Sequence, residues 1–90
     1  MFKTLEQLIA VIRQRKVSPA RGSYTKKLLI DKNLSVEKVR EEIEELIDAI
    51  EKNSNKIHES ADVLYHLMVL LEANGIKIED VMDELKKRQK

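Results

Sequence analysis

Apolar residues recur along this chain at three- and four-residue spacing, which is the spacing of one face of an α-helix. The first such stretch predicts a helix from Thr4, which can cap it, to about Arg15. A loop containing the single proline is expected over residues 17–23. A short helix then follows over residues 24–30, and residues 31–34 are expected to form a second connection.

The two longest patterned stretches come next, and they predict a pair of helices that fold back on each other. The first is expected to be capped by Ser35 and to end at the turn residues 53–55. Its apolar seam consists of Val36, Val39, Ile43, Leu46 and Ile50. The second runs over residues 56–73, and Gly75 fits the left-handed position that ends helices. Because the connection is short, the pair should form an antiparallel hairpin, followed by a last helix over residues 79–88.

Composition agrees with an all-α fold. The chain has 90 residues with 2 Gly, 1 Pro and no Cys. We therefore expect one domain over residues 1–90, without disulfides or thiolate metal sites. No apolar run reaches the roughly 18 residues of a membrane span, and the N-terminus does not resemble a signal peptide. These features predict a soluble cytoplasmic protein that does not bind membranes, and a core this small is often completed by oligomerisation.

Charge is unevenly distributed along the chain. Residues 1–32 carry eight Lys/Arg against two acids, a net charge of +6, whereas residues 33–90 carry nine against fourteen, a net charge of −5. The basic residues 1–32 can bind phosphate groups beside a cation-binding site formed by the acidic residues 33–90. Alternatively, the basic and acidic surfaces can simply attract each other. Its candidate phosphate-binding residues are Arg13, Arg15, Lys16, Arg21, Lys26 and Lys27. No nucleic-acid-binding motif is present, so we expect no nucleic-acid partner.

Six acidic residues crowd the first helix of the hairpin. They are Glu41, Glu42, Glu44, Glu45, Asp48 and Glu51, with no basic residue among them. Like charges one turn apart destabilise a helix by roughly 0.2–0.5 kcal/mol per pair, and a solvated face would more often interleave Lys. Glu42 and Glu45 lie on the shoulder of the apolar seam, so they should lean toward the second helix of the hairpin.

Asp62 is the second unusual position, because residues 61–71 are apolar nearly all round. An unpaired buried carboxylate is costly, and no Lys or Arg lies one turn from Asp62 in its helix. The hairpin can bring Glu59 and Asp62 opposite Glu42 and Glu45, giving four oxygen donors that suit Mg²⁺ or Mn²⁺. Glu41 can add a donor or act as a general base. A solvated acidic face and a hydrogen-bonded structural Asp remain the alternatives.

Two further observations limit the choice. His66, one turn after Asp62, can hydrogen-bond a ligating carboxylate, contact substrate or simply pack within the bundle. A di-iron site needs Glu three residues before each His, but Asn55 and Val63 occupy those positions. The di-iron alternative is therefore disfavoured.

Several motifs resemble those of the phosphoribosyl-ATP pyrophosphohydrolases. They occur in the same order and with matching spacing over about residues 5–88. They are Gly22-Ser23-Tyr24-Thr25, Glu41-Glu42-x-x-Glu45, Glu59-x-Ala61-Asp62-x-x-Tyr65-His66 and Gly75-Ile76. The paired acids are shared with the wider MazG-type nucleotide pyrophosphohydrolases. The Ser-Tyr-Thr and Tyr-His motifs are more specific to the phosphoribosyl-ATP branch.

The resemblance implies Mg²⁺-dependent hydrolysis of 1-(5-phosphoribosyl)-ATP to 1-(5-phosphoribosyl)-AMP and pyrophosphate, the second step of histidine biosynthesis. It also implies a homodimer whose paired hairpins form a four-helix bundle. The resemblance maps the family's acidic motif onto Glu41, Glu42, Glu45, Glu59 and Asp62. We expect Glu41, Glu42 and Glu45 as catalytic groups and Glu42, Glu45, Glu59 and Asp62 as metal ligands. Together with the charge pattern and the position of His66, the motifs suggest Tyr24, Lys27, Arg13, Arg21 and His66 as substrate contacts. The alternatives are a MazG-type hydrolase of ordinary or damaged nucleoside triphosphates and a non-catalytic helical dimerisation module.

Overall fold

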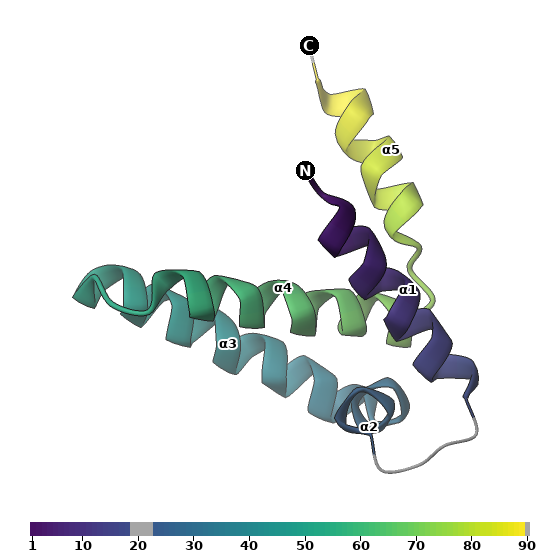
Figure 1. Cartoon of the computed structure of the whole chain (residues 1–90), viewed down its shortest axis with the longest axis horizontal. Coiled ribbons are helices and arrows are strands. Elements are labelled where there is room, and N and C mark those ends of the chain that lie inside the picture. Colours follow the sequence, from purple (N-terminus) through teal and green to yellow (C-terminus); the bar gives the residue numbers. More distant parts are fainter. Residues whose placement is uncertain (19–22, 90) are drawn as a thin grey trace.

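The computed structural model describes residues 1–18 and 23–89, and all regular secondary structure in this part is helical. Its helices are α1 (Lys3–Val17), α2 (Tyr24–Ile30), α3 (Lys32–Lys52), α4 (Lys56–Ala73) and α5 (Ile78–Arg88). The helices α3 and α4 form the expected antiparallel hairpin, α1 crosses α4, and α5 extends away from the hairpin (Figure 1). The all-α prediction is confirmed, and no helix of the described part is both long and apolar enough to cross a bilayer.

Left-handed residues end both hairpin helices, as predicted for Gly75. Asn53 has φ 54° after α3, and Gly75 has φ 69° after α4. Asn and Gly tolerate this conformation better than other residues do. The Ile76 amide donates to the Leu71 carbonyl at 2.9 Å, which satisfies one of the free carbonyls at the end of α4.

Two predicted helix starts are wrong. The helix α3 begins at Lys32, because the Asp31 carboxylate accepts a hydrogen bond from the Leu34 amide at 3.1 Å and caps it. Residues 31–34 are therefore not a connection, and Ser35 lies inside the helix, where it is 1% exposed. The helix α1 begins at Lys3, with Phe2 at its cap position and no capping side chain, so Thr4 is not the cap.

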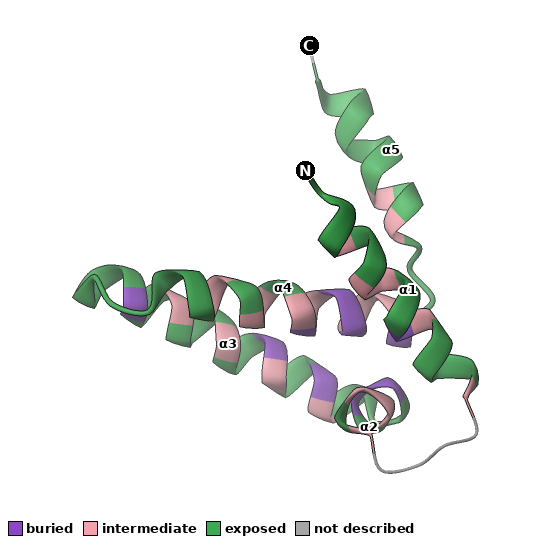
Figure 2. Ribbon diagram, in the orientation of Figure 1, coloured by how far each residue is buried: buried purple, intermediate pink, exposed green. Residues whose placement is uncertain are grey.

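The core lies where α1 and α2 meet α4 (Figure 2). Its buried residues are Ile12, Leu28, Leu29, Met68, Val69 and Ala73. The hairpin is packed less completely, because the face that α3 turns to α4 differs from the predicted seam. Val39 is buried and Leu46 is half-buried, but Val36, Ile43 and Ile50 are 37%, 43% and 56% exposed.

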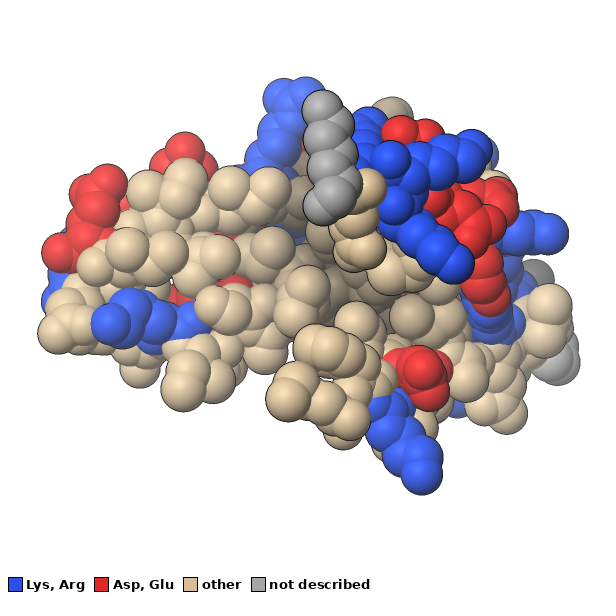
Figure 3. Space-filling model, turned by 90° about the horizontal axis from the view of Figure 1, so that it is seen from above, with Lys and Arg blue, Asp and Glu red and all other residues tan. Residues whose placement is uncertain are grey.

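A second apolar stripe therefore remains uncovered on the hairpin. It consists of Val36, Ile43, Ile47 and Ile50 on α3 with Ile57 and Leu64 on α4. Seen from above, uncharged side chains cover most of the hairpin, whereas charged side chains gather around α1 and α5 (Figure 3). An exposed stripe along two long helices fits the pairing of two hairpins into a four-helix bundle.

Candidate active site

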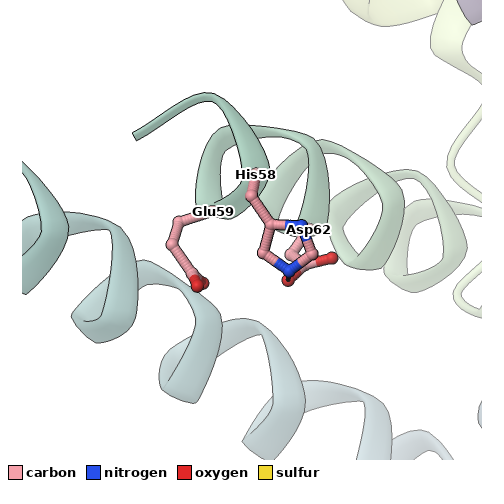
Figure 4. Close-up of side chains that lie close together, drawn as sticks. All are labelled: His58, Glu59 and Asp62. Atoms are coloured by element: carbon pink, nitrogen blue, oxygen red, sulfur yellow. Dashed lines mark ion pairs between the residues drawn. The ribbon is translucent and has the colours of Figure 1, made fainter. Parts of the chain in front are cut away.

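The hairpin brings the predicted acidic residues together. Glu42 and Glu45 come from α3, and Glu59 comes from the first turn of α4. One carboxylate oxygen from each of these three residues lies within 4.8 Å of the other two. A second set, formed by ligand atoms of His58, Glu59 and Asp62, meets the same limit (Figure 4). The four predicted metal ligands therefore fall into two groups of donors that share Glu59.

Two of these carboxylates are poorly satisfied. Oε2 of Glu42 and Oε2 of Glu59 are shielded from solvent and have no hydrogen-bond partner among the described residues. Burial raises the pKa of Glu42, and the neighbouring carboxylates of Glu45 and Asp62 raise it further, although His66 opposes the shift. The pKa of Glu59 is also raised, first by burial and then by the charges of Glu45 and Asp62. The negative charge of each acid thus makes ionisation of its neighbours less favourable.

A divalent cation fits these residues better than any partner found in the described part of the chain. There, no Lys or Arg forms an ion pair with Glu42, Glu45 or Glu59. The ion-pair contact of Asp62 is with His58, whose Nε2 lies 3.4 Å from Oδ2. Carboxylate oxygens are hard donors that suit Mg²⁺ or Mn²⁺, and such an ion would satisfy the two shielded oxygens.

Glu41 is not brought to this cluster. Its side chain is exposed, and its Oε2 lies 3.1 Å from Nζ of Lys38, one turn earlier on α3. It belongs to neither group of donor atoms. The structure therefore separates Glu41 from the other four acids of the motif.

Tyr24 and His66 form a hydrogen-bonded link between α2 and α4. His66 is 7% exposed, and its Nδ1 lies 2.7 Å from the Asp62 carbonyl oxygen. Since a carbonyl can only accept, Nδ1 carries the proton, and Nε2 can accept from the Tyr24 hydroxyl at 2.9 Å. Burial raises the pKa of Tyr24, which keeps this hydroxyl protonated as a donor. His66 thus holds the backbone of Asp62 while packing within the fold.

Among the aromatic rings near this link, Tyr24 remains partly exposed to solvent. Tyr24 and Tyr65 are stacked with their ring centroids 6.4 Å apart, and the Tyr65 hydroxyl bonds to the Thr25 hydroxyl. Tyr24 is 47% exposed, so it remains accessible to a ligand. The Tyr65–Thr25 contact was not predicted, because it joins residues 40 positions apart.

The predicted substrate-binding cations are less well placed. Arg13 donates from Nε to Glu72 at 2.7 Å and from its two terminal nitrogens to Glu79 at 2.6 and 2.9 Å. These bonds raise the pKa of Arg13 and join α1 to α4 and α5, so the side chain is not directed to the acidic cluster. Lys27 is exposed on α2, and Arg21 lies outside the described residues.

His58 also lies at the cluster, although no role was predicted for it. Its four-residue spacing from Asp62 and its position directly before Glu59 are the signals that could have identified it. Its ring lies over Asp62 on the same helix in Figure 4. The site therefore includes a nitrogen donor as well as carboxylates.

Comparison with known proteins gives a consistent result. The sequence model of the family described as phosphoribosyl-ATP pyrophosphohydrolase matches residues 5–89. The chain is 42% identical over 97 residues to the phosphoribosyl-ATP pyrophosphatase of Methanocella arvoryzae, covering 100% of both proteins.

Two relatives are longer and have bifunctional names. The chain is 43% identical over 90 residues to the chloroplastic histidine biosynthesis bifunctional protein of Arabidopsis thaliana, covering 94% of this chain and 32% of that protein. It is 44% identical over 87 residues to the bifunctional histidine biosynthesis protein of Pyrococcus furiosus, covering 96% of this chain and 41% of that protein. The chain thus spans less than half the length of these two relatives.

Proposed function

Because this chain belongs to the phosphoribosyl-ATP pyrophosphohydrolase family, we propose that it hydrolyses 1-(5-phosphoribosyl)-ATP to 1-(5-phosphoribosyl)-AMP and pyrophosphate. This reaction is the second step of histidine biosynthesis. The observation that supports it best is the meeting of Glu42, Glu45 and Glu59 between α3 and α4, where two carboxylate oxygens have no partner in the described part of the chain. In the reaction, water attacks one phosphorus of the anhydride bond between the α- and β-phosphates. Its oxygen stays on that phosphorus, and the bridging oxygen leaves with the other product.

Glu42, Glu45, Glu59 and Asp62 are the residues that would hold Mg²⁺, or Mn²⁺ in its place. When bound, the cation neutralises phosphate charge and polarises the phosphorus–oxygen bonds. The hairpin fixes these carboxylates before substrate arrives, so little reorganisation is needed. His66 contributes by holding the Asp62 backbone at 2.7 Å.

The substrate's phosphoribosyl end is assigned to the open side of α2. Tyr24 offers an exposed ring beside the cluster, and Lys27 is an exposed cation on the same helix. Arg13 is left out of this role because Glu72 and Glu79 already occupy its guanidinium. We retain Glu41 as the group that orients the attacking water, a role that requires its carboxylate to leave Lys38.

We further propose that the protein acts as a homodimer. The uncovered stripe on the hairpin includes Ile43, Ile47 and Ile50, and a second hairpin would bury it as a four-helix bundle. Ile43→Glu should place a charge in that interface and yield monomers in light-scattering chromatography. Asp48→Lys, a charge change at an exposed position of α3 outside the stripe, should leave the dimer intact. A monomeric wild-type protein would contradict the dimer.

Product analysis with phosphoribosyl-ATP tests the reaction. Pyrophosphate should appear with Mg²⁺ but not with EDTA, and Glu45→Gln should lower kcat by about 10²–10³. Glu44→Gln, a neighbouring exposed carboxylate outside both donor groups, is the matched control and should stay active. Equal or faster release from dATP or dCTP would favour the MazG-type alternative. Metal-independent release, or an active Glu45→Gln variant, would contradict the proposed mechanism.

A further inference from the structure

Lys38 lies between the acidic cluster and α2, which packs beside the N-terminal end of α3 (Figure 1). Its Nζ is 3.1 Å from Oε2 of Glu41, one turn later on α3. Burial raises the pKa of Tyr24, and the positive charge of Lys38 opposes this rise. The hydrogen bond to Glu41 raises the pKa of Lys38, and the charge of Glu42 adds to this effect. The Lys38 ammonium is therefore a neighbour of both the exposed tyrosine and an expected metal ligand.

The ion pair between Lys38 and Glu41 gives no strong structural reason for this lysine. The two side chains are 35% and 58% exposed, so solvent screens their attraction. Charged pairs at this spacing on a helix surface contribute little to stability. Glu41 can therefore give up Lys38 to a more highly charged partner at small cost.

The triphosphate of the proposed substrate is such a partner. It carries several negative charges and must approach the four carboxylates that are expected to hold the metal. One Mg²⁺ offsets only two of those carboxylate charges, so a further cation beside the cluster favours binding. Arg13 is already held by two acids, whereas the contact of Lys38 is a weak surface pair. A lysine ammonium is well suited to phosphate, which it binds as a point charge.

We propose that Lys38 binds a phosphate oxygen of the substrate, and that it exchanges the Glu41 carboxylate for this phosphate when the substrate arrives. The exchange frees Glu41 from its cation, as the water-orienting role of Glu41 requires. Substrate binding and the release of Glu41 are then one event, in which only ion pairs and hydrogen bonds change. The inference rests on the proposed function for the identity of the phosphate ligand.

Calorimetry with pyrophosphate and with phosphoribosyl-AMP, each with Mg²⁺, tests the contact without turnover. Lys38→Gln should weaken binding of the contacted ligand by about tenfold, because a hydrogen bond between charged groups is lost. An effect on pyrophosphate places Lys38 at the β- or γ-phosphate, and an effect on phosphoribosyl-AMP places it at the α-phosphate or the phosphoribosyl phosphate. Arg40→Gln, the matched control, removes the same charge from an exposed position of α3 and should change binding by less than about twofold.

The exchange also predicts an energetic coupling between Lys38 and Glu41. Glu41→Gln removes the competitor for Lys38, so it should tighten phosphate binding by about twofold relative to Glu44→Gln, which removes an exposed carboxylate one turn away. In a Lys38→Gln background these two acid variants should bind phosphate alike, because no lysine is left to be released. A merely structural ion pair would not produce this pattern.

Equal binding of both ligands by Lys38→Gln and Arg40→Gln would overturn the inference. An undiminished advantage of Glu41→Gln in the Lys38→Gln background would overturn the exchange. Lys38→Arg keeps the charge and should bind within about threefold of wild type, which separates loss of charge from misfolding. If Lys38 binds pyrophosphate but wild type releases none from phosphoribosyl-ATP, the proposed function fails while the phosphate contact stands.

Discussion

Replacing Glu42 with Gln removes one negative charge from the carboxylate cluster while nearly preserving the size of the side chain. In the metal-free protein, Glu42 and Glu45 have carboxylate oxygens within 4.8 Å of each other. At that separation two unit charges repel by about 1 kcal/mol in a water-like medium and by about 3 kcal/mol at an effective dielectric constant of 20. Because Glu42 is only partly shielded, the lower figure applies, and metal-free Glu42→Gln should be more stable than wild type by about 1 kcal/mol.

This advantage should depend on pH in a defined direction. The pKa of Glu42 is raised above its usual value of 4.5, so the folded wild-type protein holds this proton more tightly than the unfolded chain does. Wild-type stability therefore falls as pH rises from about the usual pKa through the raised one. The advantage of Glu42→Gln should be present at neutral pH and shrink toward zero below pH 4.5.

Saturating Mg²⁺ should reverse the order of stability. A ligand at 100 times its Kd stabilises the folded state by about 2.7 kcal/mol. Glu42→Gln replaces a charged ligand carboxylate with a neutral amide, so the variant should gain much less stability from Mg²⁺. Urea unfolding in EDTA and in Mg²⁺ measures both effects, with Glu44→Gln as the exposed control. If Glu42→Gln were less stable than wild type in EDTA at neutral pH, or gained equally from Mg²⁺, the charge-cluster reasoning would be refuted.

Three other perturbations test separate contacts. Ser35→Ala should raise stability by roughly 1 kcal/mol in thermal unfolding, because the buried Ser35 hydroxyl has no hydrogen-bond partner within residues 1–18 and 23–89; a loss of stability would show that it has one. Arg13→Met should speed hydrogen exchange throughout α5 without altering Mg²⁺ binding, because it removes the contact between Arg13 and Glu79. The pKa of Glu79 is lowered from 4.5 to about 2, so α5 of the wild-type protein should loosen as pH falls through this range and Glu79 becomes protonated. Tyr24→Phe should cost about 1 kcal/mol in urea unfolding by leaving His66 Nε2 without its donor, and an unchanged midpoint would argue against that bond.

Local periodicity was sufficient to predict the hairpin and the meeting of its acids. In a regular helix, spacing determines which residues share a face, so Glu42 and Glu45 could be placed on the side of α3 near α4. The same argument placed Glu59 one turn before Asp62. It could not divide the donors between two groups, because that division depends on side-chain rotamers rather than on spacing.

Where the structure differs from the sequence-based expectations, local sequence leaves the choice open. Asp31 and Ser35 are both good capping residues, and the structure uses Asp31, so that a single residue separates α2 from α3. Arg13 contacts acids 59 and 66 positions away, which no spacing rule anticipates. The predicted seam of α3 included Ile43 and Ile50, which remain exposed in a single chain, because a helix of a bundle can present apolar residues to more than one neighbour.

The central claim is that carboxylates from α3 and α4 share a divalent cation. Anomalous scattering from crystals grown with Mn²⁺ tests it most directly, because the signal locates the ion without reference to activity. We expect a peak between Glu42, Glu45 and Glu59, with carboxylate oxygens about 2.0–2.3 Å away. Well-ordered crystals at saturating Mn²⁺ with no peak at these residues, and with their carboxylates turned to solvent, would contradict it.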